Sequence, residues 1–218
     1  MKTKLKTRTV LVTGFEPFDG ASINPSQEIA RNLHGTVIAG HSLVGALLPC
    51  VFGAAIPELK RLLDLHRPAL VICVGQAGGR AAITPERVAI NINDALIPDN
   101  AGAQPVDRPI VKGGPAGYFS TLPIKAIVAA LREVGVPSEV SQTAGTFVCN
   151  HVFYGLMHAL RTRKSVRGGF IHVPYLPEQA KKGQASLPLE DMVCGVALAV
   201  ETALRLKKDL RLAGGQTQ

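Results

Sequence analysis

The residue with the clearest capacity for chemistry is Cys149, which follows a turn of small residues and precedes a helical pattern. The turn reads Ser141-Gln-Thr-Ala-Gly-Thr-Phe-Val-Cys149, and a helix is expected from about residue 150 to residue 161. A helix N-terminus offers unpaired N–H groups and the positive end of the helix dipole, and both favour a thiolate over a thiol. The sequence therefore predicts that Cys149 is a nucleophile.

Two further residues suit the partners that a cysteine nucleophile needs. His172 stands near the end of an apolar strand pattern at 168–173, and Glu86 begins an alternating pattern. A carboxylate can orient a histidine that acts as the base, although most glutamates are simply solvated. His151 is a weaker alternative for the base, because it lies two residues beyond Cys149 and so on a different helix face. The three residue types together predict a cysteine hydrolase.

Two loops after apolar strand patterns complete the set of candidate site segments. The loop at 14–20 contains Phe15 and Phe18, which either clasp a flat or apolar ligand or anchor the loop to the core. From this stretch alone, anchoring is favoured. The loop at 75–80 is rich in glycine, lacks a Walker lysine and ends in Arg80. Its N–H groups and Arg80 suit an oxyanion, and an ordinary tight turn is the alternative.

The elements that must position these residues alternate along the chain. Apolar runs predict strands at 10–14, 36–42, 44–48, 70–74, 86–93, 138–141 and 168–173, and helical patterns cover 24–35, 56–66, 122–134, 150–161 and 189–210. Residues 98–123 are expected to form a long functional loop. This alternation predicts a single three-layer α/β/α domain over residues 1–218, with a mostly parallel, partly mixed central sheet. Ligands of such folds bind where strands end.

Composition narrows the class of protein. The chain has 218 residues, of which 46% are hydrophobic and 18% charged, as in a globular protein. Its net charge of +8 is spread along the chain without interleaved aromatic residues, so no nucleic-acid partner is expected. No apolar run reaches the length of a membrane span, and the apolar run after the basic N-terminus is far shorter than a signal-peptide core. Both observations predict a cytoplasmic protein with no membrane partner. Cys73 and Cys194 are expected to be core residues, and no cysteine pair suggests a metal.

Several motifs, in order from about residue 9 to residue 180, resemble the pyroglutamyl peptidase I (pyrrolidone-carboxylate peptidase) family. They are Gly14-Phe-Glu-Pro-Phe, Gly75-Gln-Ala-Gly-Gly-Arg, Thr84-Pro-Glu-Arg-Val-Ala-Ile-Asn, Ile97-Pro-Asp-Asn, Thr146-Phe-Val-Cys-Asn and Phe170-Ile-His-Val-Pro. The stretches around the cysteine and the histidine are the specific ones. The resemblance implies a cysteine peptidase that removes N-terminal pyroglutamyl residues from peptides, without a metal or other cofactor.

The resemblance also implies roles for individual residues and an assembly state. Cys149 would be the nucleophile, His172 the general base and acid, and Glu86 the orienting acid. The implied substrate-binding residues are Phe15, Phe18, Asn24, Gln76, Arg80, Phe147 and Val148. Family members often form dimers or tetramers, so a homo-oligomer is expected. Aromatic walls and a few hydrogen-bonding groups suit a small uncharged lactam.

One position departs from the family pattern. The family commonly has an arginine where this chain has Leu96, within Asp94-Ala-Leu-Ile-Pro-Asp99. Leucine carries no charge and donates no hydrogen bond, so we expect weaker electrostatic support for the site. The alternative function is therefore an impaired or non-catalytic relative that still binds a lactam.

Overall fold

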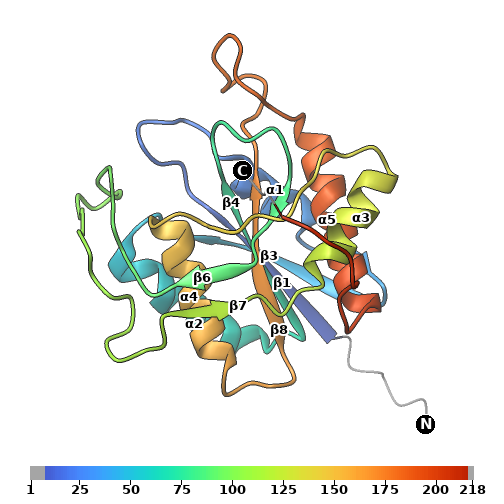
Figure 1. Ribbon diagram of the computed structural model, residues 1–218, viewed down its shortest axis with the longest axis horizontal. Coiled ribbons are helices and arrows are strands. Elements are labelled where there is room, and N and C mark those ends of the chain that lie inside the picture. The colour runs from blue at the N-terminus through green and yellow to red at the C-terminus, as the bar shows by residue number, and fades with distance from the viewer. Residues whose placement is uncertain (1–7, 216–218) are drawn as a thin grey trace.

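The computed structural model describes residues 8–215 and consists of three layers (Figure 1). A six-stranded sheet of order β2-β3-β1-β4-β8-β5 forms the middle layer. Its four central strands run parallel: β1 (Arg8–Phe15), β3 (His41–Leu48), β4 (Leu70–Gln76) and β8 (Arg167–Val173). The edge strands β2 (Val37–Ile38) and β5 (Thr84–Pro85) are antiparallel to their neighbours. The predicted fold class, with its partly mixed sheet, is confirmed.

Helices cover both faces of the sheet, as Figure 1 shows. One face packs against α1 (Pro25–Leu33), α3 (Ile124–Glu133) and α5 (Leu189–Arg205), and the other against α2 (Phe52–His66) and α4 (Val148–Leu160). Central strands buried on two faces must be apolar throughout, which is why β1 and β4 read as continuous apolar runs. A separate antiparallel ribbon of β6 (Val88–Ile90) and β7 (Gly117–Phe119) lies beside α4.

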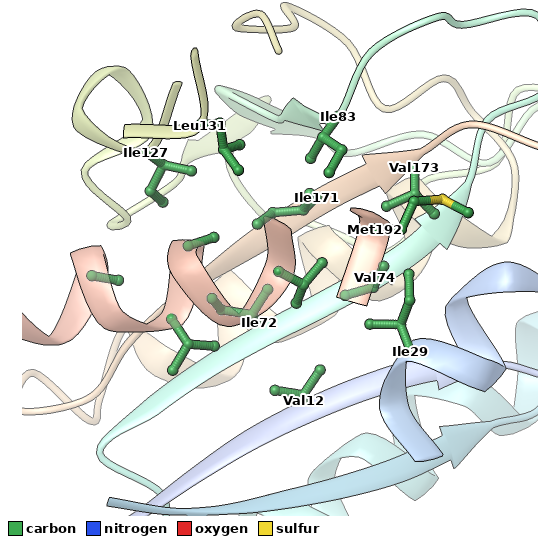
Figure 2. Packing of buried hydrophobic residues seen from close by; sticks show 14 of the residues in the cluster. Val12, Ile29, Ile72, Val74, Ile83, Ile127, Leu131, Ile171, Val173 and Met192 are labelled. Atoms are coloured by element: carbon green, nitrogen blue, oxygen red, sulfur yellow. The ribbon is translucent and has the colours of Figure 1, made fainter. Parts of the chain in front are cut away.

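Each face of the sheet has its own hydrophobic core. Figure 2 shows the first, in which sheet residues such as Val12, Ile72 and Ile171 pack against Ile127 of α3 and Met192 of α5. The second core joins the opposite side chains of the same strands to α2 and α4. Because side chains alternate along a strand, each central strand contributes to both cores. The two cores fix the positions at which the strands end and the site loops begin.

Some predicted boundaries are wrong. The last helix ends at Arg205 rather than at residue 210, because the chain turns back there to pack along α3. Residues 138–141 form no strand and pair only through single bridges, Ile83 with Ser138 and Glu86 with Ser141. The helix expected from residue 150 begins two residues earlier, at Val148, which places Cys149 inside its first turn.

Candidate active site

Cys149 is the second residue of α4, and its thiol lies against the end of β4. Phe147 caps the helix with an extended backbone and makes no side-chain hydrogen bond to the first turn. A Cβ added to Gly75 of β4 would lie 2.8 Å from Cys149 Sγ. The absence of a side chain at Gly75 therefore makes the space that the sulfur uses. Cys149 as a whole residue is half-buried.

The sheet register brings His172 to the same place. Gly75 of β4 pairs with His172 of β8 in the parallel ladder. Paired residues of adjacent strands project side chains to the same face, and the strands lie about 4.8 Å apart. The sulfur therefore lies beside the residue that pairs with His172, on the face of the sheet to which the His172 side chain projects. Phe170, two residues earlier on β8, packs its ring 4.8 Å from the His172 ring and helps to fix the orientation of the imidazole.

Glu86 completes the arrangement from the edge of the sheet. Its Oε1 lies 2.7 Å from His172 Nδ1, and its side chain has no exposed area. The residue directly follows β5, whose Thr84 pairs with His172. A carboxylate on Nδ1 directs the other ring nitrogen, Nε2, to the reacting groups. The structure thus brings the predicted acid and base together, beside the predicted nucleophile.

Burial shifts the acid–base equilibria of both Cys149 and His172. It lowers the pKa of His172 below its ordinary value of 6.5, against the opposing effect of Glu86. It also raises the pKa of the Cys149 thiol, with Cys50 and Glu86 adding to the rise and Arg80 opposing it. Both shifts favour the uncharged forms, a thiol beside a neutral imidazole. Burial of the thiol thus opposes the preference for a thiolate that the helix N-terminus provides.

Arg80 lies on the acid rather than on an open pocket wall. Its Nη1 donates to Glu86 Oε1 over 2.7 Å and to Thr84 Oγ1 over 2.6 Å. Its Nη2 donates to the carbonyl oxygen of Thr143, in the turn before α4. Arg80 ends the glycine loop, as the sequence indicates, and the structure adds its three partners.

The aromatic residues divide between the core and the site. Phe15 is 2% exposed and packs on Phe170, whereas Phe18 is half-buried with its ring 6.0 Å from that of Phe147. Phe52 packs edge-on against Phe147 from the other side. Phe147 and the buried Val148 directly precede Cys149. These rings give the site an apolar wall, with Phe15 beneath it as an anchor.

The side chains of Asn24 and Gln76 have protein partners. Asn24 caps α1, because its Oδ1 accepts from both the N–H and the hydroxyl of Ser26, while its Nδ2 donates to the carbonyl of Glu16. Gln76 follows Gly75 and so projects to the opposite face of the sheet from His172. Its Oε1 accepts from Gln179, which also donates to the carbonyl of Ile23. Both predicted ligand contacts would have to use the remaining N–H groups or the backbone.

Sequence reasoning missed residues that hold the site together. Asn150 is fully buried and bonds three backbone groups of the β6 segment, namely the N–H and carbonyl of Ile90 and the carbonyl of Ile92. His151, considered as an alternative base, instead bonds Asn93 through Nδ1, and burial lowers its pKa to about 4. The consecutive polar residues Asn150 and His151, on a mostly apolar helix, are the sequence feature that could have indicated these contacts. Gln179 bonds groups in three loops, and no sequence feature indicates this role.

Leu96 takes no part in this network. Its side chain is 96% exposed, on a loop attached to the turn before α4 by bonds between Asp94 and Thr146. The positive charge beside Glu86 belongs to Arg80. The leucine at position 96 therefore does not remove the electrostatic support of this carboxylate. Of the other cysteines, Cys50 and Cys73 are buried as free thiols, but Cys194 is exposed and the core placement expected for it is wrong.

Within residues 8–215, no three histidine, cysteine, aspartate or glutamate side chains are grouped so that they could bind a metal ion. None of the helices in that range is both long enough and apolar enough to cross a membrane.

A three-layer α/β fold with a cysteine at a helix start, beside a histidine bonded to a carboxylate, defines an α/β cysteine hydrolase. The family model of pyroglutamyl peptidase matches residues 8–206. The chain therefore belongs to the pyroglutamyl peptidase family and is a cysteine peptidase. The resemblance seen in the motifs is confirmed.

Individual relatives agree with this assignment over nearly the whole chain. The pyrrolidone-carboxylate peptidase of Cupriavidus necator is 62% identical over 213 residues, which cover 96% of this chain and 99% of the relative. The crystal structure of pyroglutamyl peptidase I from Bacillus amyloliquefaciens has a TM-score of 0.93 at 48% identity, covering 95% of this chain and all of the other. The pyrrolidone carboxyl peptidase of Thermococcus litoralis has a TM-score of 0.92 at 38% identity and covers 95% of this chain and 100% of its own. The alternative of a non-catalytic lactam-binding relative is not favoured.

Proposed function

We propose that this protein removes N-terminal pyroglutamyl residues from peptides, with Cys149 as nucleophile, His172 as base and acid, and Glu86 as the orienting acid. The 2.7 Å bond between Glu86 and His172, at the strand end where Cys149 Sγ lies, carries the assignment. The similarity to pyrrolidone-carboxylate peptidases supports the substrate class. Peptides with an N-terminal pyroglutamate are thus the proposed partners.

The acylation step follows from the neutral resting pair. His172 Nε2 accepts the thiol proton as Cys149 Sγ attacks the pyroglutamyl carbonyl carbon, and the carbonyl oxygen takes the electron pair. N–H groups of the first turn of α4, which lack a side-chain cap, are suited to bind this oxyanion. The intermediate then collapses: the C–N bond breaks, and the leaving amine takes the proton from His172. A thioester on Cys149 remains.

Deacylation uses the same groups in reverse. His172 accepts a proton from water as the water oxygen attacks the thioester carbonyl, and the proton then returns to the leaving sulfur. Free pyroglutamate and the regenerated thiol result. Glu86 stabilises the imidazolium in both halves of the cycle without itself taking the proton. These two reaction steps balance without a metal or other cofactor.

The apolar wall and the nearby polar groups are proposed to hold the lactam ring. Phe18, Phe147 and Val148 would contact its carbon face, with Phe15 supporting them. The free hydrogen of Asn24 Nδ2 and the backbone around Gln76 would bind its polar atoms. Arg80 would support the site through Glu86. A lactam has one donor and one acceptor and no charge, so a site without an opposing charge at the ring suits it.

Three broader predictions belong to the same proposal. Residues 1–218 are proposed to act as one catalytic domain, working as a homodimer or homotetramer without nucleic-acid or membrane partners. A cytoplasmic location fits a mechanism that needs a free thiol, because reducing compartments keep thiols reduced. Light scattering on the purified protein measures the assembly state, and a monomer at working concentrations would contradict the oligomer.

Substrate selectivity tests the proposed function. The protein is incubated with the pyroglutamyl, prolyl and glutamyl amides of one fluorogenic amine. Hydrolysis of the pyroglutamyl amide alone is expected, because the prolyl ring lacks the carbonyl oxygen and the glutamyl group carries charges. Equal hydrolysis of the prolyl amide would contradict the lactam pocket. No hydrolysis of any amide by reduced protein would contradict the activity.

A further inference from the structure

The buried Glu86 carboxylate has an uneven set of contacts. Its Oε1 accepts from both Arg80 and His172, each over 2.7 Å, while Oε2 is buried and has no hydrogen-bond partner among the residues that the structure describes. A buried carboxylate is costly unless it is paired. The guanidinium of Arg80 therefore supplies the positive charge that offsets the cost of burying this carboxylate.

Arg80 connects its own loop with the nearby β5 segment and with the turn before α4, which is distant along the chain. The residue itself follows the glycine loop of β4. Through Nη1 it holds Thr84 and Glu86 around β5, and through Nη2 it holds the Thr143 carbonyl in the turn that leads into α4. One guanidinium thus contacts both the acid of the proposed triad and the segment that carries the nucleophile.

We propose that Arg80 is a positioning residue: its guanidinium fixes the Glu86 carboxylate against His172 and holds that pair in register with the turn before Cys149. This role rests on the proposed function and extends it, since Arg80 acts through Glu86 and Thr143 and does not touch the reacting atoms. Arg80 is thereby distinguished from the residues that contact the lactam.

The charge of Arg80 also affects the pKa values of His172 and Cys149. It lowers the pKa of His172 and opposes the rise in the pKa of Cys149. The other titratable groups facing this centre are Glu86 beside β5, Cys50 before α2 and Cys73 of β4. Cys50 and Cys73 are buried thiols whose pKa values are raised to about 12, so they stay uncharged at neutral pH. Arg80 and Glu86 are thus the charges that set the protonation of the reacting pair.

Lysine cannot reproduce the whole arrangement. The planar guanidinium donates from two nitrogens in fixed directions, to Glu86 on one side and to Thr143 on the other, whereas an ammonium is a single point charge. Arg80→Lys keeps the positive charge but loses the two-directional donation of the guanidinium, whereas Arg80→Met loses both. Comparison of the two variants separates the electrostatic contribution from the geometric one.

The test measures alkylation of Cys149 by chloroacetamide, a neutral reagent, as a function of pH. The wild type, Arg80→Met, Arg80→Lys and Arg87→Met are compared. Arg87 is the matched control because it adjoins Glu86 in sequence but bonds Gln142 and the Gly214 carbonyl instead. In Arg80→Met the alkylation midpoint should rise by about one pH unit, as expected when a charge close to a titrating group is lost. Arg87→Met and Arg80→Lys should keep the wild-type midpoint.

Turnover supplies the second measurement. In Arg80→Met, kcat should fall roughly 10–100-fold with KM little changed, as when a histidine loses an outer partner that orients it. Arg80→Lys should show an intermediate kcat, and the acid limb of the Arg80→Met pH profile should move upward because the pKa of His172 rises. If Arg80→Met does not fold, a wild-type kcat in Arg80→Lys overturns the geometric role.

The two measurements separate this inference from the proposed function, because alkylation needs no peptide. A wild-type midpoint and kcat in folded Arg80→Met would overturn the role of Arg80, whatever the substrate is. An alkylation profile that depends on Arg80, in a protein that hydrolyses no pyroglutamyl amide, would support the role of Arg80 and contradict the peptidase activity.

Discussion

Substitution of Gly75 by alanine should disable the site without dismantling the fold. The added Cβ would lie 2.8 Å from Cys149 Sγ and 2.8 Å from Cζ of Phe170. The Phe170 ring is itself held between Phe15, Phe153 and His172. The methyl group is therefore confined on two sides, and the sulfur is the atom freer to move.

The expected loss of rate follows from the overlap between the added Cβ and Cys149 Sγ. Ordinary contact requires the sulfur to withdraw by roughly an ångström, and a displacement of that size at a reacting atom costs about 100-fold in rate. Overpacking of this kind destabilises by about 1–3 kcal/mol, which lowers Tm by about 2–12 °C in a protein of this size. Rotation of the thiol would relieve the clash but would also turn it away from His172, so the rate falls either way.

Kinetic and thermal measurements on Gly75→Ala and a matched glycine variant test this reasoning. Gly53→Ala is the control, because Gly53 lies in α2 and an added Cβ there meets nothing within 4 Å. It should raise stability by about 0.5–1 kcal/mol and leave kcat/KM unchanged. If Gly75→Ala keeps wild-type kcat/KM, the sulfur does not occupy the space beside Gly75 in the active protein, and the account of the site is wrong.

Three further predictions concern the acid, the base and the end of the chain. Glu86→Gln removes the charge that stabilises the His172 imidazolium, so kcat should fall roughly 100–10,000-fold, and a change below twofold would refute that role. Because burial lowers the pKa of His172, the acid limb of kcat/KM should lie below pH 6.5, where falling pH protonates the base; a limb above pH 7 would contradict this. Asp209→Ala removes a carboxylate that accepts from the N–H groups of Lys125 and Ala126 at the start of α3, so we expect a loss of about 1 kcal/mol in thermal unfolding with unchanged kcat. An unaltered Tm would show that this cap contributes nothing.

The layers of the fold could be predicted because each rests on a local pattern. The strands β1, β4 and β8 are apolar runs ended by glycine or by the site histidine, and the turn of small residues before Cys149 marks the start of α4. The last helix was extended too far because Leu206 and Leu210 continue the apolar spacing. Both are exposed in the structure, since the chain leaves the helix where Asp209 reaches α3.

The partners within the site could not be predicted from local patterns. Glu86 and His172 meet only because β5 pairs with β8, and residues 80 and 143 meet only after the sheet has formed. Asn24 has the sequence signature of a helix cap as well as that of a ligand residue, and the structure gives it the capping bonds. The pKa of Cys149 could not be predicted for the same reason, because a sequence shows the helix end but not the burial that raises this pKa.

The measurement that tests the central claim most directly is hydrolysis of a pyroglutamyl fluorogenic amide by the wild type, Cys149→Ala and Cys194→Ala. Cys194 is the matched control, because it is a free cysteine exposed on α5. We expect turnover by the wild type and by Cys194→Ala, and none by Cys149→Ala with an unchanged Tm. Turnover by folded Cys149→Ala at the wild-type rate would contradict this expectation.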